Sequence, residues 1–261
     1  MKPNPYSADT YIQWHESEVA ADKPLRDKLT QIRDQLKKDA REDLILLHDV
    51  LTSMFAYTRN EFRIAANTEV TFHTPLTQAL VTSPSTAPSL SYDLLFKSFD
   101  STINKMWRKA KDHPVVTLPT LFDHVTDFIR TDVRTDTLEV AQFLAERMNH
   151  LPEIIYADEL RKKFEDRIAS CVFEPEMKMA SGYFAYHGLV TFKPGYRVEI
   201  QIYSALMSEW RRLSHILYEQ VRINPIEQHE FGSKESRLIS LGHMLHLAEC
   251  EIQRLSKDMK H

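Results

Sequence analysis

The chain of 261 residues is 43% hydrophobic, enough to build one large core or two small ones, and we expect a folded protein. Its formal net charge of −4 at pH 7 argues against a surface built throughout for nucleic acid and limits any RNA partner to a confined patch. The two cysteines, Cys171 and Cys250, form no Cys-x-x-Cys pattern, which argues against a disulfide framework or a zinc site and favours a reducing setting. With no signal-peptide pattern and no apolar run long enough to span a bilayer, we expect a cytoplasmic protein without a membrane partner.

The distribution of glycine excludes two classes of nucleotide-binding enzyme. All five glycines lie at position 182 or later. A dinucleotide-binding fingerprint and a phosphate-binding P-loop both need a glycine cluster in a strand-turn-helix unit, and the chain has none. Any phosphate group must therefore be bound by side chains.

The first 90 residues are expected to form a helical region. Apolar side chains recur at helical spacing through residues 24–67, in one stripe that begins at Leu25 and a second that begins at Leu44. The Ser/Pro/Thr-rich segment 82–89 is predicted to be a loop, and it is the best internal boundary, although it is short and is expected to join two parts of one unit.

Strand and helix patterns then alternate. Residues 91–98 are predicted to form a short strand, and residues 100–111 a helix capped by Asp100 or Ser101. A second strand region is expected within 121–135, followed by an amphipathic helix over 136–151.

Two apolar runs joined through Pro194-Gly195 predict a β-hairpin within residues 181–204. A helix is expected over 205–222, then a polar connection from 224 to 232, and residues 223–261 are expected to end in a last helix. This order predicts an α+β fold in which a mixed sheet is flanked by helices. The central unit would span residues 91–222.

Glu199 and Gln201 occupy alternate positions of the second hairpin strand, whose other face carries Val198, Ile200 and Ile202. The polar face is either the solvent side of an antiparallel sheet or the floor of a site.

The face on which His187 lies depends on the hairpin turn. A simple turn over residues 193–196 would pair His187 with Ile202, on the apolar face. A bulge would be needed to place it on the face of Glu199.

Three cations, Lys105, Arg108 and Lys109, fall at i, i+3 and i+4 of the helix expected over 100–111, and Lys97 precedes that helix. This cationic face would suit a polyphosphate, although a solvated helix face is the alternative. Asp127 or Asp123, set against Glu199 across adjacent strands, would form a two-carboxylate Mg²⁺ site of the kind that shares its metal with substrate phosphates.

In this order, the segments resemble the synthetase domain of the RelA/SpoT family, enzymes that transfer pyrophosphate from ATP to the 3′-hydroxyl of GDP or GTP. The segment LFKSFDSTINK (95–105) is similar to the family motif R-x-K-S-x-x-S-I-x-x-K, and DFIRTDV (127–133) is similar to D-L-x-G-x-R. GYFAYH (182–187) is similar to G-Y-x-S-x-H, and EIQIYS (199–204) to E-I-Q-I-R-T. His215 and Tyr218 match a helix that ends in H-x-x-Y-K, so that the resemblance spans residues 92–222, half of the chain.

This resemblance implies the nucleotidyltransferase-like RelA/SpoT synthetase fold with N- and C-terminal helices. It implies Mg²⁺ bound by Asp127 and Glu199, with Glu199 activating the acceptor hydroxyl. The residues that would bind the ATP phosphates are Lys97, Ser98, Ser101, Lys105 and Arg108. The residues that would bind the acceptor are Tyr183, whose ring stacks on the guanine, His187, Gln201 and His215.

Several positions depart from the family motifs. Leu95 and Asp132 stand where the family has arginines, and Arg212 stands where an acid is usual. Losing two arginines removes several kcal/mol of charge-assisted bonding to phosphate unless Arg108, Arg130 or Arg134 substitutes.

Two other functions remain open beside the pyrophosphokinase. Some single-domain relatives are toxins that pyrophosphorylate the 3′ end of tRNA. Phe184 is compatible with such a changed acceptor, and residues 161–163 with Lys178 would either receive an RNA backbone or form a solvated face. The second alternative is a fold that has lost catalysis and binds a nucleotide or a protein. A homo-oligomer or an antitoxin partner is compatible with either.

Overall fold

The structure is a computed structural model that describes residue 4 and residues 6–81, 90–110, 115–223, 230 and 232–259. It does not describe the side chains of residues 81, 90 and 218–223. The loop expected at 82–89, most of the connection expected over 224–232 and the side chain of Tyr218 therefore lie outside the described residues.

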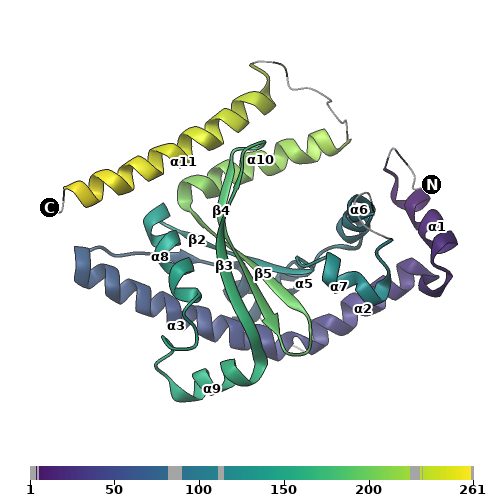
Figure 1. Cartoon of the computed structure of the whole chain (residues 1–261), viewed down its shortest axis with the longest axis horizontal. Helices are drawn as coiled ribbons and strands as arrows, with labels where there is room; N and C mark the ends of the chain where they lie inside the picture. Colours follow the sequence, from purple (N-terminus) through teal and green to yellow (C-terminus); the bar gives the residue numbers. More distant parts are fainter. Residues whose placement is uncertain are drawn as a thin grey trace.

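A five-stranded sheet in the order β1-β2-β5-β4-β3 forms the centre of the fold (Figure 1). The strands are β1 (Phe72–His73), β2 (Ile129–Thr135), β3 (Ile168–Lys178), β4 (Tyr183–Phe192) and β5 (Arg197–Ser204). Strands β2 and β5 are parallel, whereas the other neighbours are antiparallel. The predicted α+β fold with a mixed sheet flanked by helices is confirmed.

The N-terminal region is helical, as predicted. Its elements are α1 (Ala8–Glu18), the 3₁₀ turn η1 (Ala20–Asp22), α2 (Leu25–Asp39), α3 (Arg41–Ala66) and α4 (Pro75–Val81). The pattern over 24–67 corresponds to two helices that meet at Ala40, and the stripes that begin at Leu25 and Leu44 are buried. The short strand β1, between α3 and α4, was not predicted.

Residues 91–98 do not form the predicted strand. The segment begins with the short helix α5 (Leu90–Asp93), and the amides of Leu95 and Phe96 donate to the carbonyls of Tyr92 and Asp93 in turns. Only Phe96 forms an isolated bridge, to Ile129. The apolar run was mistaken for a strand because it is buried; it does bond to the β2 segment, through the Lys97 amide and the Leu95 carbonyl, but the local turn bonds interrupt it before a strand can form.

The helix predicted over 100–111 is α6 (Phe99–Lys109), and its N-cap is Ser98 rather than Asp100 or Ser101. The region 121–135 follows the 3₁₀ turn η2 (Leu118–Thr120) and contains α7 (Leu121–His124) and then β2, so that only its second half is a strand. The helix predicted over 136–151 is α8 (Leu138–Met148), which is followed by α9 (Asp158–Arg167).

The predicted hairpin consists of β4 and β5, with a three-residue connection of residues 193–195. Val198, Ile200 and Ile202 are fully buried, and α8, which contacts these strands, packs against α3. Helices α10 (Ala205–Ile223) and α11 (Lys234–Asp258) lie side by side beyond the end of the sheet (Figure 1). None of the helices in the described ranges is long and apolar enough to cross a bilayer.

Candidate functional site

A buried cluster of three charges lies where α6 meets the start of β2. The ammonium groups of Lys97 and Lys105 donate to the two carboxylate oxygens of Asp127, at 2.7 and 2.6 Å. Burial alone would raise the pKa of Asp127, but the two lysines hold it at about 2. For Lys97 burial acts in the other direction and lowers the pKa, and the charge of Asp127 opposes that shift. The structure thus brings together three of the predicted site residues as one ion-paired unit.

The first turn of α6 lies directly beside this unit. The hydroxyl of Ser98 accepts the amide of Ser101 and donates to the Ser101 hydroxyl, so both serines occupy the N-terminus of the helix, an end that favours anions. Arg108 is exposed on the same helix, whereas Lys105 points to Asp127. The cationic face is therefore split between a half-buried lysine, Lys105, and a solvated arginine, Arg108.

Glu199 and Gln201 are half-buried on the polar face of β5. The parallel register with β2 places Arg130 opposite Glu199 and Asp132 opposite Gln201. The side-chain amide of Gln201 donates to Glu199. Asp127 precedes the paired part of β2, so it is not at the position opposite Glu199.

His187 lies on the polar face of β4, opposite Gln201 and not opposite Ile202. The expectation from a simple turn was wrong by one residue, because residues 193–195 form a three-residue loop in which Gly195 adopts a φ of 103°. A shift of one residue exchanges the two faces of a strand. The three-residue loop therefore places His187 on the same face of the sheet as Glu199.

A chain of hydrogen bonds connects β3 to Glu199. Nδ1 of His187 lies 2.7 Å from the carboxylate of Glu176, and Nε2 lies 2.7 Å from the hydroxyl of Tyr183. That hydroxyl is also 3.1 Å from the carbonyl oxygen of the Gln201 side chain. Through Gln201, the chain ends at Glu199.

The protonation of His187 sets the direction of this chain. Burial lowers the pKa of His187, while Glu176 and Glu199 oppose the shift. The Tyr183 hydroxyl has a single proton, which it donates either to the Gln201 side-chain oxygen, with Nε2 of the doubly protonated ring donating to the hydroxyl, or to Nε2 of the neutral ring; in both cases Nδ1 donates to Glu176. Burial raises the pKa of Tyr183 itself. The hydroxyl of Tyr183 is thus bonded to both His187 and Gln201, which fix the hydroxyl end of the tyrosine ring.

Tyr183 is enclosed by cations as well. The ammonium of Lys178 and the guanidinium of Arg211 lie 5.4 and 5.6 Å from its ring centroid. Arg211 also donates to the side-chain oxygen of Gln201 and lies 4.2 Å from the ring centroid of Tyr203. Arg211 and Glu176 are site residues that the sequence analysis missed; the only signal for Arg211 was its place beside Arg212, in the helix with His215.

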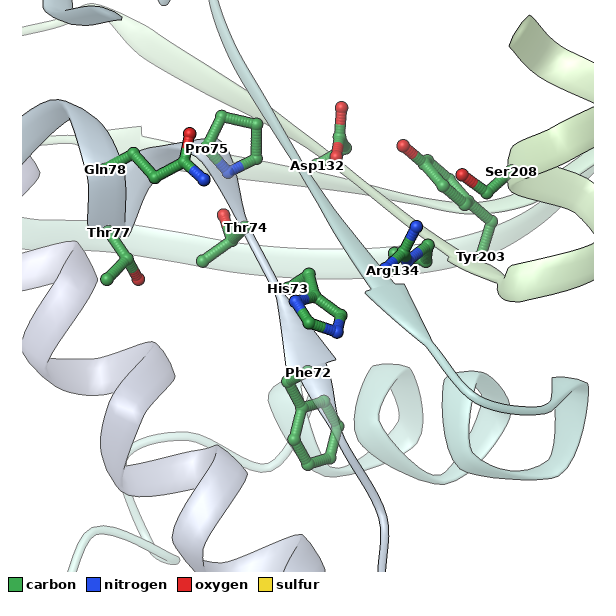
Figure 2. A pocket seen from close by; sticks show the side chains of 10 residues that line it. All are labelled: Phe72, His73, Thr74, Pro75, Thr77, Gln78, Asp132, Arg134, Tyr203 and Ser208. Carbon is green, nitrogen blue, oxygen red and sulfur yellow. The ribbon is translucent and has the colours of Figure 1, made fainter.

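A cleft runs over this polar face between α4 and α10. One hollow, of about 410 Å³, is lined by the 91–95 segment and by Arg130, Asp132, Gln201, Arg211 and His215. A second hollow, of about 440 Å³, shares Pro75, Gln78 and Asp132 with the first and continues to Arg134, Tyr203 and Ser208. Figure 2 shows Gln78 on α4 on one side of it, Asp132 and Arg134 on β2, and Tyr203 and Ser208 on the other side. The predicted acceptor residues Gln201 and His215 therefore line one cleft.

The motif departures occupy different places. Leu95 is buried and lines the cleft, and Asp132 accepts a hydrogen bond from Tyr203. Phe184 points to the opposite side of β4, where it is buried and its ring stacks on His246 of α11 at 4.1 Å. The packing of α11 therefore explains its apolar character.

Three of the basic residues considered for RNA, Arg161, Lys163 and Lys178, have partners within the protein. Lys163 pairs with Glu159, and Lys178 pairs with Glu176. The guanidinium of Arg161 donates to the carbonyl of Ile155. These contacts are those of a solvated face, the alternative to an RNA-binding surface.

The predicted pair Asp127 and Glu199 fits Mg²⁺ in its donor chemistry, because Mg²⁺ is usually held by one or two carboxylates together with substrate phosphates. Each oxygen of Asp127 accepts from one lysine, so a metal at Asp127 would use the remaining lone pairs beside two ammonium groups or displace one of them, and a polyphosphate is an anion that could receive the displaced ammonium. Within the described ranges no three His, Cys, Asp or Glu side chains gather as a metal site.

No protein-family model matches the chain, and no curated protein shows a significant sequence match. Solved structures do match. Small alarmone synthetase 1 from Bacillus subtilis is 16% identical, with 90% of this chain and 98% of that chain covered and a TM-score of 0.50. The same enzyme bound to its product pppGpp is 17% identical, with 89% and 100% covered and a TM-score of 0.52. The chain therefore has the fold of the small alarmone synthetases, as the motif resemblance implied.

Proposed function

We propose that the protein is a pyrophosphokinase that transfers the β,γ-pyrophosphoryl group of ATP to the 3′-hydroxyl of a guanine nucleotide. The observation that carries this proposal is the hydrogen-bonded series Glu199, Gln201, Tyr183 and His187, which lies beside a cleft in a chain with the alarmone synthetase fold. Arg130, three residues after Asp127 in the chain, lies opposite Glu199 in the strand register, and its charge lowers the pKa of Lys97, so it stands between this series and the lysine cluster.

The proposed role of each residue follows from its charge. Lys97 and Lys105, with the N-terminus of α6 at Ser98 and Ser101, would bind the phosphates of ATP. Arg108 is exposed and would reach only an outer phosphate oxygen. Mg²⁺, held by Asp127 and Glu199, would neutralise charge that develops on the transferred group.

Glu199 would accept the proton of the acceptor 3′-hydroxyl. The hydroxyl oxygen then bonds to the β-phosphorus of ATP, the bond from that phosphorus to the α,β-bridging oxygen breaks, and AMP leaves. Tyr183, fixed through His187 and Gln201, would hold the acceptor base, and His215 would contact the acceptor from the cleft that it lines together with Gln201. Positioning of this kind supplies most of the catalysis in phosphoryl transfer.

The test is a transfer assay with γ-labelled ATP, Mg²⁺ and GDP, GTP or an adenine nucleotide as acceptor. We expect labelled product with GDP or GTP and a loss of at least about 100-fold in kcat for Glu199→Gln, because the general base is removed. Glu174→Gln, which changes an exposed carboxylate, is the matched control and should keep full activity. Absence of product with every acceptor, or full activity of Glu199→Gln, would refute the proposal.

Labelled tRNA in the same assay tests the toxin alternative. ATP binding in a calorimeter without transfer to any acceptor would instead indicate a fold that has lost catalysis, the outcome for which Leu95 and Asp132 are the motif-level evidence.

A further inference from the structure

We propose that Arg33, on α2, is a positioning residue for the phosphate-binding end of the site, because its guanidinium holds the backbone that carries Lys97. The inference rests on the proposed function for its consequence in catalysis. It assigns a role to the N-terminal helical region, which no motif resemblance covers.

The contacts of Arg33 all go to one short segment. Its two terminal nitrogens donate to the carboxylate of Asp93, at 3.0 and 2.7 Å. One of them also donates to the carbonyl of Asp93 at 3.1 Å, and Nε donates to the carbonyl of Lys97 at 3.1 Å. The side chain of Arg33 is only 18% exposed. One guanidinium therefore spans the residues from the end of α5 to the start of α6.

Lys97 is held on its other side as well. Its amide donates to the carbonyl of Phe128 at 2.8 Å, next to Asp127. Both backbone groups of Lys97 are thus bonded, one to α2 and one to the segment before β2, and its ammonium is left to meet Asp127. Ser98, the N-cap of α6, follows directly. Any movement of this backbone would displace the lysine and the anion-favouring helix end together.

The chemistry of the contact requires arginine. A planar guanidinium can bond a carboxylate with two nitrogens while its remaining N–H groups reach carbonyls, whereas a lysine ammonium has no such fixed fork. The hydrogen bond from Arg33 is the main cause that holds the pKa of Asp93 at about 2. Lys37 also pairs with Asp93, and the hydroxyl of Tyr92 donates to the carbonyl of Lys37 at 2.7 Å. If Arg33 is replaced, Lys37 still pairs with the charge of Asp93, but the hydrogen bond to the Lys97 carbonyl is lost.

The experiment compares Arg33→Met, Arg33→Lys and Asp93→Asn with Lys38→Met, a change at an exposed position of the same helix. For each protein we would measure KM for ATP, KM for the acceptor, kcat, the dissociation constant of a non-hydrolysable ATP analogue and hydrogen exchange of the Lys97 amide. Arg33→Met should raise KM for ATP and the analogue dissociation constant by roughly tenfold or more, because misplaced binding groups are costly. The KM for the acceptor should change less than about twofold, and the amide should exchange faster.

Arg33→Lys should lie between the wild type and Arg33→Met, and Lys38→Met should match the wild type. If Arg33→Met fails to fold, Asp93→Asn, which removes the carboxylate charge and keeps its shape, takes its place with the same expected direction. Unchanged ATP affinity and unchanged exchange at Lys97 in a folded Arg33 or Asp93 variant would overturn the proposal. If the wild type transfers nothing to any acceptor, the proposed function fails, while analogue binding and hydrogen exchange still decide the role of Arg33.

Discussion

At the scale of single residues, Glu176 shows how a position outside every motif can set the chemistry of a site residue. Its carboxylate lies 2.7 Å from Nδ1 of His187, which it reaches diagonally from β3, since the residue directly opposite His187 is Glu174. Burial lowers the pKa of His187, and the charge of Glu176 works against that shift.

We therefore expect Glu176→Gln to lower the pKa of His187 further, because the stabilising negative charge is lost while burial stays. The measurement is an NMR titration of the His187 ring. Glu174→Gln removes an exposed carboxylate from the neighbouring position of the same strand and should move the pKa much less. A rise of the His187 pKa in Glu176→Gln, or equal shifts in both variants, would show that Glu176 does not have this role.

The site residues that could be predicted from the sequence were those with a local pattern. Glu199 and Gln201 break an otherwise apolar strand, and Lys97, Ser98, Ser101 and Lys105 share one short motif. Glu176, Arg33 and Arg211 could not be predicted, because their roles come from contacts across 11, 64 and 10 residues of chain, to His187, Lys97 and Gln201. Sequence spacing carries no information about such pairs until the fold is known.

At the scale of elements, the packing of α11 on the hairpin depends on two glycines. A Cβ atom at Gly242 would lie 2.4 Å from the carbonyl oxygen of Gly182 and 2.8 Å from the indole nitrogen of Trp210. Gly182 itself has a φ of 73°, and Trp210 donates to the carbonyl of Leu238. The helix thus touches the backbone that immediately precedes Tyr183.

Gly242→Ala should destabilise the protein by about 1–3 kcal/mol, the usual cost of forcing extra atoms into a packed contact. The sign of this change in the free energy of unfolding is informative, because alanine in place of glycine in an open helix stabilises a protein by about 1 kcal/mol. The free energy of unfolding in urea and the near-ultraviolet circular dichroism would report the effect, since Trp210 lies at the contact. Ser240→Ala, at an exposed position of the same helix, is the control and should be neutral or slightly stabilising. A more stable Gly242→Ala protein would contradict the close packing.

Among the elements, the periodic helices were predictable and the hairpin register was not. Helices α2, α3, α6 and α8 carry apolar side chains at helical spacing, and this pattern predicts both that a helix forms and which of its faces is buried. The register of β4 against β5 depends instead on one loop residue, Gly195, and on whether the turn holds two or three residues. Local apolar character likewise could not separate the turns of residues 91–98 from a strand.

At the scale of the whole molecule, the N-terminal helices and the sheet share one core. Buried side chains from Tyr11 through Ile202 form a single cluster, so the expected boundary near residue 90 does not separate two cores. Charged bridges connect the same parts. The carboxylate of Asp43, on α3, accepts from Arg167 at 2.7 and 2.8 Å and from the hydroxyl of Tyr196. Asp93 and Asp127 bind cations of α2 and α6 in the same way.

These bridges predict how the stability of the protein depends on pH. The pKa values of Asp93 and Asp127 are about 2 in the folded protein, below the value near 4 of an unfolded aspartate. The folded state therefore binds fewer protons in this window. Its added stability is fully present above about pH 4 and is lost as the pH falls through 2. Asp93 contributes less than Asp127, because its side chain is 40% exposed, against 13% for Asp127.

Comparison of the wild type with Asp127→Asn isolates the larger of the two effects, since asparagine does not titrate. The wild type should be the more stable protein at pH 6, because the variant leaves two buried ammonium groups without their carboxylate. The difference in free energy of unfolding should shrink by about 2 kcal/mol between pH 6 and pH 2, as Asp127 becomes protonated in the wild type. Urea unfolding at pH 6, 4, 3 and 2 measures it, with Asp123→Asn, at an exposed position, as the control whose difference stays near zero. If the Asp127→Asn difference stayed constant with pH, Asp127 would not be held by its lysines in the folded protein.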